Sequence, residues 1–177
     1  EETSRESPAP GGGTIAAYMG ALGAALGTMV ANLSSHKAGW DARWEEFSNW
    51  ADKGQQIQAE LLVLVDEDTE AFNRIMDAFG LPKGTDEEKA LRSAAIQEAT
   101  LFATQVPLHT MQASFKVFEL CKAMAEEGNP NSVSDAGVGI LAARAAVLGA
   151  GLNVKINASG LKDRETADKL VAEANEL

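Results

Sequence analysis

The 177-residue chain lacks charged side chains over a long stretch near its start. No Asp, Glu, Lys or Arg occurs from Ser7 to His36, although charged residues make up 23% of the sequence. This stretch reads SPAPGGGTIAAYMGALGAALGTMVANLSSH. It is consistent with a membrane span, with a glycine-rich ligand loop leading into a buried helix, or with a tightly packed core helix.

The membrane interpretation has the least support. Residues 14–33 reach the roughly 20 residues that cross a bilayer, but they are mostly Ala and Gly, which gain little free energy on transfer into lipid. No cluster of Lys or Arg flanks them, and no second long Leu-rich run follows. The opening residues EETSRE are acidic and polar, unlike a secretory signal. We therefore expect no membrane partner.

Cysteine, histidine and basic residues are also scarce. Cys121 is the single cysteine, which excludes an intramolecular disulfide, and two histidines give little material for a zinc site. We predict no metal, a core position for Cys121 and a reducing, cytoplasmic location. The net charge of −11 argues against a nucleic-acid partner, because binding phosphates requires clustered Lys and Arg.

The residues that are present predict helices. Pro8, Pro10 and the three glycines 11–13 predict an irregular loop, followed by a helix from about Thr14 to Leu33. A second helix is expected over residues 40–79, ended by GLPKG. Its apolar side chains recur at steps of three and four, in the stripe Ile57, Leu61, Leu64, Phe72, Ile75 and Phe79.

Three further segments complete the pattern. Thr85 and Glu88 have the spacing of a capping box that opens a third helix. A fourth helix over 136–154 carries a single charge, Arg144, and Ser134 or Asp135 is expected to cap it. An amphipathic segment, 163–177, follows. No alternating strand series, fixed-period repeat or linker is present.

The sequence therefore predicts one all-α domain over residues 1–177, a bundle of long antiparallel helices. The first and fourth helices are nearly free of charge all round, which is typical of buried helices. A small bundle can bury few such helices. We expect these two Gly/Ala-rich helices to form the interface of a homodimer as well.

Asp68 is the most informative single residue, because it falls within the apolar stripe, four residues after Leu64 and four before Phe72. It is either an acid satisfied by a local partner or a general acid/base in a dry cavity. Gln97 has a similar place before Leu101, where a surface or interhelical hydrogen bond is the simpler explanation. Arg144 must be paired or face a ligand if it is buried.

The PGGG loop supplies backbone N–H groups and the positive end of a helix dipole, which suit a carboxylate, a phosphate or a polar heterocycle. The sequence GxxxxGK[ST] is absent, so this is not a P-loop. By itself the loop is a weak signal.

Six segments in order make a stronger one: SPAPGGGTIAAYMGALGAALGTMVANL, VDEDTEAF, LPKGTDEEKALRSAAIQEA, VPL, GNPNSVSDAGVG and NVKIN. Over residues 7–160 the chain resembles the formiminotetrahydrofolate cyclodeaminase / methenyltetrahydrofolate cyclohydrolase family, and most of all the cyclodeaminase part of the bifunctional formimidoyltransferase-cyclodeaminase. Thr14 stands where serine is commoner. Members usually begin earlier and end later, so we expect a domain trimmed at both ends, with the formimidoyltransferase as a fused or associated domain.

The resemblance implies an all-helical homodimer whose folate site lies at or near the subunit interface. It implies cyclisation of 5-formiminotetrahydrofolate to 5,10-methenyltetrahydrofolate with release of ammonia, a step linked to histidine degradation. The alternative is hydrolysis of methenyltetrahydrofolate to 10-formyltetrahydrofolate. A non-catalytic folate-binding or dimerisation module is an alternative of another class. No cofactor beyond the tetrahydrofolate substrate, polyglutamylated or not, is implied.

The resemblance also suggests roles for single residues. Asp68 is the candidate acid/base, and Asp135 is the second choice. Lys83 and Arg92 are candidates for the carboxylates of the glutamate tail. The remaining substrate-binding candidates are Pro10, Gly11, Gly12, Gly13, Asn32, Gln97, Asn129, Ser134, Asn153 and Asn157.

Overall fold

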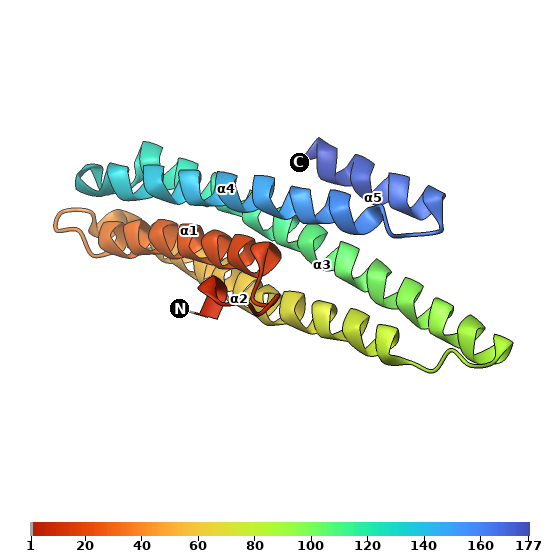
Figure 1. Ribbon diagram of the computed structural model, residues 1–177. Coiled ribbons are helices and arrows are strands. Elements are labelled where there is room, and N and C mark those ends of the chain that lie inside the picture. The colour runs from red at the N-terminus through yellow and green to blue at the C-terminus, as the bar shows by residue number, and fades with distance from the viewer. Residues whose placement is uncertain (1) are drawn as a thin grey trace.

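A computed structural model describes residues 2–177, and within them the regular structure is entirely helical (Figure 1). Its helices are α1 (Gly12–Ser35), α2 (Trp44–Gly80), α3 (Asp86–Glu127), α4 (Val133–Ala158) and α5 (Arg164–Glu176), with 3-10 turns η1 (Glu2–Ser4), η2 (Asp41–Arg43) and η3 (Pro130–Ser132). The predicted all-α class is confirmed. Glu1, the first residue of the predicted domain, lies outside the described residues.

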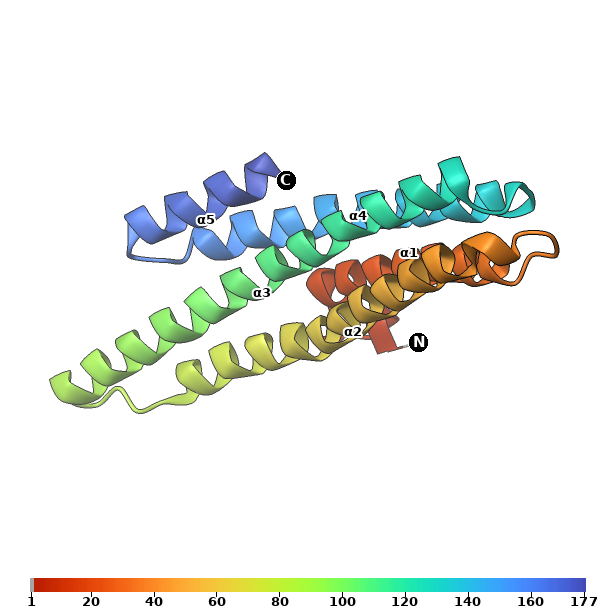
Figure 2. The same ribbon diagram turned by 180° about the vertical axis from the view of Figure 1, so that it is seen from behind.

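The first four helices run antiparallel to their neighbours in sequence and pack as a bundle (Figures 1 and 2). α1 contacts α2, α3 and α4, and α5 lies along α4 and α3. α2 and α3 are longer than α1 and α4, so their connected ends extend beyond the other two helices as a two-helix projection (Figure 2). At the base of this projection, Phe72 and Ile75 of α2 and Ala103 of α3 line a cavity together with the start of α1.

The helix ends agree with the sequence in one place and differ in another. Glu88 N–H donates to Thr85 Oγ1 at 3.2 Å and Thr85 N–H donates to the Glu88 carboxylate at 3.1 Å, so the capping box is confirmed. The predicted limits of the fourth helix are wrong. Ser134 and Asp135 lie inside its first turn, and Ser132 holds the cap position without a side-chain hydrogen bond.

α4 also continues through NVKIN to Ala158. Asn residues interrupt helices when their side chains compete for the local backbone. Here Asn153 Nδ2 donates to Gly149 O, one turn back, and Asn157 Nδ2 donates to Ala103 O on α3. Neither amide therefore opens the helix.

Small residues allow close packing of α1 on its neighbours. A Cβ on Gly23 would stand 2.8 Å from Gly139 O of α4, so a larger residue there would push the two helices apart. Larger side chains fill the remaining interior, and Phe47, Leu61 and Leu120 are fully buried. The two charge-poor helices thus contact each other directly in the bundle.

The outer sides of α1 and α4 are strongly apolar and exposed. We call this surface the α1/α4 face; its exposed side chains are Tyr18, Leu22, Met29, Leu33, Val138, Leu141, Leu148, Leu152 and Ile156. Arg144 is also exposed on α4, so it is not the buried charge that the sequence suggested. By length and composition alone, segments 12–35 and 130–158 could cross a membrane, and both are built into the bundle.

The apolar stripe of α2 is buried only in part. Ile57, Leu61 and Leu64 are buried as predicted, but Phe79 is 50% exposed. α1 begins beside Asp68, as the Thr14–Asp68 hydrogen bond shows, and therefore does not cover the later part of α2. On the projection, the apolar stripe of α2 packs on α3 alone and is not covered by a further helix of the described residues.

Candidate active site

A cavity of about 180 Å³ lies where α1 begins. The N-terminal loop, α1, α2, α3 and α4 all contribute to its walls. We call it the loop cavity; its lining residues are Pro8, Ala9, Gly11, Gly12, Gly13, Asp68, Ala71, Phe72, Ile75, Ala103, Asn153 and Asn157. Three segments that are distant in sequence, on α2, α3 and α4, therefore converge on the segment that carries the triple glycine.

Asp68 is the only ionisable side chain among the described residues that line this cavity. It is half-buried, and its Oδ2 accepts a hydrogen bond of 2.7 Å from Thr14 Oγ1. A Cβ on Gly13 would stand 2.7 Å from the Asp68 carboxyl carbon, which is closer than a methyl group can approach. The third glycine therefore leaves the space that the carboxylate occupies.

The Asn153 and Asn157 side chains form the opposite wall. They are four residues apart on α4 and so share one side of the helix. Each Nδ2 donates to a backbone carbonyl, at 3.0 Å for Asn153 and 2.6 Å for Asn157. Each Oδ1 is left able to accept a hydrogen bond from a ligand N–H.

The first turn of α1 closes the cavity at the glycine side. Gly11 holds the cap position in an extended conformation, and Ile15 N–H makes the first helical hydrogen bond, to Gly11 O. The N–H groups of Gly12, Gly13 and Thr14 precede that bond and have no partner within the helix. They contribute a partial positive charge beside the Asp68 carboxylate.

A second, more open groove of about 430 Å³ adjoins the loop cavity and shares Pro8, Gly11 and Gly12 with it. Pro10 lines this groove, and Met19 of α1 and Ala145 of α4 extend it. The groove therefore runs from the triple glycine onto the α1/α4 face.

Four of the candidate residues lie at the opposite end of the bundle: Asn32, Asn129, Ser134 and Asp135. Asp135 and Asn153 are 18 residues apart on α4, which places them about 27 Å apart. Asn32 is separated from Gly13 by a similar length of α1. A single chain therefore does not bring these four residues to Asp68.

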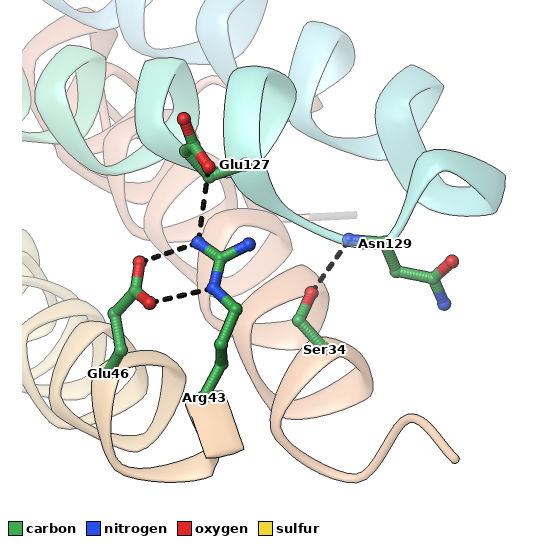
Figure 3. Close-up of polar contacts among 5 residues, drawn as sticks. All are labelled: Ser34, Arg43, Glu46, Glu127 and Asn129. Atoms are coloured by element: carbon green, nitrogen blue, oxygen red, sulfur yellow. Dashed lines mark hydrogen bonds and ion pairs between the residues drawn. The ribbon is translucent and has the colours of Figure 1, made fainter. Parts of the chain in front are cut away.

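At that opposite end, polar groups hold helix ends together (Figure 3). Arg43 donates to Glu46 at 2.8 Å and to Glu127 at 3.1 Å, and Asn129 N–H donates to Ser34 Oγ at 2.8 Å. The Asn129 side chain accepts from Asn131 N–H and so caps η3. These contacts explain part of the polar sequence at this end without a ligand.

Within residues 2–177, the side chains of Asn32, Ser134 and Asp135 make no such contacts. Asn32 is exposed and lines a groove of about 610 Å³ with Gln55 and Gln58 between α1 and α2. Ser134 is exposed and Asp135 is half-buried. Their suggested ligand roles stay predictions.

The remaining candidates lie on the projection. Arg92 Nη2 donates to Phe79 O at 3.1 Å, at the end of α2, and Lys83 is exposed in the α2–α3 connection. Gln97 Nε2 donates to Gly160 O at 3.1 Å, and Gln97 Oε1 accepts from Lys162 N–H at 2.6 Å. Both ends of the Gln97 amide therefore hold the α4–α5 connection on α3, which is the simpler of its two sequence-based explanations.

Cys121 lies in the core, away from this cavity. Its side chain is buried against α1 and α4, and burial raises the pKa of the thiol to about 11. The thiol is protonated at neutral pH and is a poor nucleophile. Among residues 2–177, no group of three or more His, Cys, Asp or Glu side chains is placed to hold a metal ion.

Sequence reasoning did not give Thr14 a role in the site, and it took Phe72 and Ile75 only as core. The signal for Thr14 was its position directly after the glycines, in the first turn of a helix. The roles of Phe72 and Ile75 had no such signal. Whether an apolar side chain faces a core or a cavity depends on where the neighbouring helix ends.

Comparison with known proteins bears on this arrangement. The sequence profile of the family described as Formiminotransferase-cyclodeaminase matches residues 1–176. A methenyltetrahydrofolate cyclohydrolase of Methylorubrum extorquens is 44% identical over 97% of this chain and 82% of its own length. The crystal structure of a formiminotetrahydrofolate cyclodeaminase from Thermotoga maritima is 26% identical, with a TM-score of 0.85 over 99% of this chain and 83% of that one.

The chain belongs to the formiminotransferase-cyclodeaminase family, in the part of it that carries the all-helical cyclodeaminase fold. The formimidoyltransferase-cyclodeaminase of Gallus gallus is 37% identical over 90% of this chain. That match spans only 29% of the chicken protein, and the mouse protein gives 30%. The predicted family is therefore confirmed.

Proposed function

We propose that this chain is an enzyme of folate one-carbon metabolism that closes or opens the one-carbon bridge between N5 and N10 of tetrahydrofolate. The first candidate is the closing direction, which the family resemblance implies: 5-formiminotetrahydrofolate gives 5,10-methenyltetrahydrofolate and ammonia. The observation that carries the proposal is Asp68, the one ionisable side chain that the described part of the chain places on the wall of a cavity bounded by the first turn of α1.

Asp68 exchanges the protons in the proposed reaction. N10 attacks the carbon of the protonated formimino group, forming the N10–C bond and a tetrahedral intermediate. The Asp68 carboxylate takes the proton from N10 and returns it to the departing nitrogen. The C–N bond to that nitrogen then breaks, ammonia leaves, and the positive charge stays on the methenyl bridge. Atoms and charge balance without a redox partner.

The other walls of the loop cavity hold the reactants in place. The free carbonyl oxygens of Asn153 and Asn157 accept N–H groups of the pterin or of the departing nitrogen. Phe72 and Ile75 exclude water on the side of the projection. We propose that the reaction uses no cofactor beyond the folate, since proton transfer and positioning account for it.

Hydrolysis of methenyltetrahydrofolate to 10-formyltetrahydrofolate is the second candidate. It is favoured by the 44% identity to a methenyltetrahydrofolate cyclohydrolase that this chain matches over 82% of its length. In this direction Asp68 takes one proton from the attacking water and gives it to N5 as the N5–C bond breaks. The water oxygen becomes the formyl carbonyl on N10, and its remaining proton is released to solvent. The same cavity serves both reactions.

We propose that the active form is a homodimer joined through the α1/α4 face. The loop cavity holds about 180 Å³, whereas ligand pockets are generally about 300–1,000 Å³. The adjoining groove adds about 430 Å³ but is open on the α1/α4 face. A partner subunit on that face would both bury its exposed leucines and cover the groove.

A dimer could also bring to the site those candidate ligand residues that lie far from the loop cavity in a single chain. If the two-fold axis runs across the helices, the opposite end of the partner reaches the loop cavity, and Asp135 or Asn32 of one chain joins the site of the other. On the projection, Arg92 lies about 16 Å along α2 from Asp68, near Phe79. We propose Arg92 and Lys83 as contacts for the carboxylates of a glutamate tail.

Spectrophotometry of methenyltetrahydrofolate tests the function. Purified protein is given 5-formiminotetrahydrofolate with ammonia measured in parallel, and separately methenyltetrahydrofolate in excess over its uncatalysed hydrolysis. Absorbance that rises with stoichiometric ammonia identifies a cyclodeaminase, and accelerated loss identifies a cyclohydrolase. A folded protein that binds folate without accelerating either reaction is the non-catalytic module instead.

A further inference from the structure

We infer that Thr14 is a positioning residue, which acts through Asp68 by fixing the orientation of the carboxylate. This inference rests on the proposed function, because it assumes that Asp68 exchanges a proton with the substrate. Thr14 lies in the first turn of α1 and is 5% exposed. Its hydroxyl donates 2.7 Å to Asp68 Oδ2 on α2, 54 residues away in sequence.

The hydroxyl of Thr14 is used differently from most other buried hydroxyls in this protein. Thr28, Ser34, Thr104 and Thr110 are buried in helices, and each donates to the carbonyl four residues earlier in its own helix. That arrangement is the ordinary one for Ser and Thr within a helix. In the first turn of α1, the residue four before Thr14 is Pro10 of the loop, so the hydroxyl is free to reach another helix.

The hydrogen bond makes the two carboxylate oxygens unequal. Oδ2 accepts the Thr14 hydroxyl, while no side chain of the described residues donates to Oδ1. Oδ1 is thus the oxygen left to exchange a proton with a ligand in the loop cavity. Gly13 permits this orientation, since a Cβ there would overlap the carboxyl group. Residues 13 and 14 together set the place and the rotation of the Asp68 carboxylate.

A hydrogen bond between α1 and α2 could instead serve only to hold the helices together. The two roles differ in what they change. If Thr14 positions Asp68, loss of its hydroxyl lowers kcat and leaves KM near its original value, because Thr14 does not touch the substrate. This effect on kcat also disappears in a variant in which residue 68 is no longer a carboxylate. If Thr14 has a purely structural role, loss of its hydroxyl lowers the melting temperature. That effect does not depend on whether residue 68 exchanges a proton with the substrate.

The test compares Thr14→Val, which keeps the shape and loses the hydroxyl, with Thr14→Ser, which keeps the hydroxyl. Thr28→Val is the matched control, being a buried threonine of the same helix about 21 Å away that bonds its own helix. kcat and KM are measured in whichever folate reaction the unaltered protein catalyses, with circular dichroism and thermal melting on each variant.

We expect Thr14→Val to lower kcat about 10- to 100-fold with KM changed less than about 2-fold, as loss of a hydrogen bond to a charged group predicts. Thr14→Ser should stay within about 3-fold of the original kcat, and Thr28→Val should be unchanged. In an Asp68→Asn background, adding Thr14→Val should change the residual kcat by less than about 3-fold.

The inference is overturned if the unaltered protein is active and a folded Thr14→Val retains its kcat. It is also overturned if KM alone rises, or if Thr14→Ser loses as much as Thr14→Val. If Thr14→Val does not fold, Thr14→Ala replaces it, and failure of both to fold assigns the hydroxyl to stability. An unaltered protein that is folded but inactive on both substrates removes the proposed function, and the inference with it.

Discussion

The two ends of the bundle both carry polar side chains, but they use them differently. At the loop end, Asp68, Asn153 and Asn157 point into a cavity with at least one polar atom of each side chain free for a ligand. At the opposite end, Arg43 bonds to Glu46 and Glu127, the backbone N–H of Asn129 bonds to Ser34, and these contacts close the helix ends (Figure 3).

The difference comes from what terminates α1 at each end. Its start follows a loop rich in proline and glycine. Gly13, in the first turn, has no side chain and so leaves room for the Asp68 carboxylate, and the first N–H groups of the helix have no partner within it. Its finish is covered by the α3–α4 connection, where Ser34 is fully buried. Polar groups therefore bond within the chain where a connection covers the helix end, and stay free for a ligand where the glycines leave a space.

Removal of the acid should have different effects at the two ends. Asp68→Asn should lower kcat/KM by about 10²- to 10⁴-fold, because it eliminates general acid–base catalysis and keeps the side-chain shape. Asp135→Asn should have a much smaller effect if each site is built from one chain. The methenyltetrahydrofolate assay on folded variants measures both.

A loss on Asp135→Asn as large as that on Asp68→Asn would show that the ends cooperate, as in a dimer with reversed helices. Mixing the two inactive variants then decides the matter. Restored activity in the mixture would mean that one site takes Asp68 from one subunit and Asp135 from the other.

Replacing a glycine by alanine should also have different effects at the two ends. Gly13→Ala should lower kcat by about 10²-fold, since its Cβ displaces the Asp68 carboxylate and a shift of about 1 Å has that effect. The matched change is Gly137→Ala in the first turns of α4, where a Cβ would meet nothing within 4 Å. It should stabilise the fold by about 0.5–1 kcal/mol.

Rates and denaturant unfolding curves measure this pair. Equal activity in both alanine variants would contradict the close packing of Asp68 on Gly13. A destabilised Gly137→Ala variant would indicate that this part of α4 is covered in the assembled protein.

The third prediction concerns the α1/α4 face, which connects the two ends. The double change Leu141→Glu and Leu152→Glu should give a monomer with reduced activity, because both side chains are exposed on that face. Leu91→Glu, an equally exposed leucine on the projection, is the control and should leave the oligomeric state unchanged. Size-exclusion chromatography with light scattering measures the mass of each variant.

Cys121 lies in the core between the two ends, and we expect its substitution to have the smallest effect on activity. Burial raises the pKa of its thiol to about 11, so at pH 8 a thiol reagent should modify denatured protein quickly and native protein slowly. The raised pKa also makes the stability of the fold depend on pH. Because the folded pKa lies above the unfolded one, the contribution of this thiol is complete below about pH 8.5 and is lost as pH rises toward 11.

Cys121→Ala should leave kcat unchanged and weaken this alkaline dependence. Rapid thiol modification of the native protein, with activity lost in step, would place Cys121 in the functional site and contradict its core position.

Much of this was readable from sequence. The steps of three and four on residues 57–75, the Thr85–Glu88 capping box and the lack of strand patterns predict the helices, because each is a local relation between neighbouring residues. The charge-free stretch predicts a buried α1 for the same reason. An acid within an apolar stripe marks Asp68, and six ordered segments mark the family.

The tertiary structure alone decided which polar residues meet. Asp68 and Asn157 come together because α2, α3 and α4 cross at the start of α1, and Asp135 is kept from Asn157 by about 33 Å of helix. It likewise decided that Phe79 is exposed, that Gln97 holds a connection, and that Thr14 contacts Asp68. These facts depend on where one helix ends against another, and contacts between residues 54 or more positions apart leave no periodic trace in a single sequence.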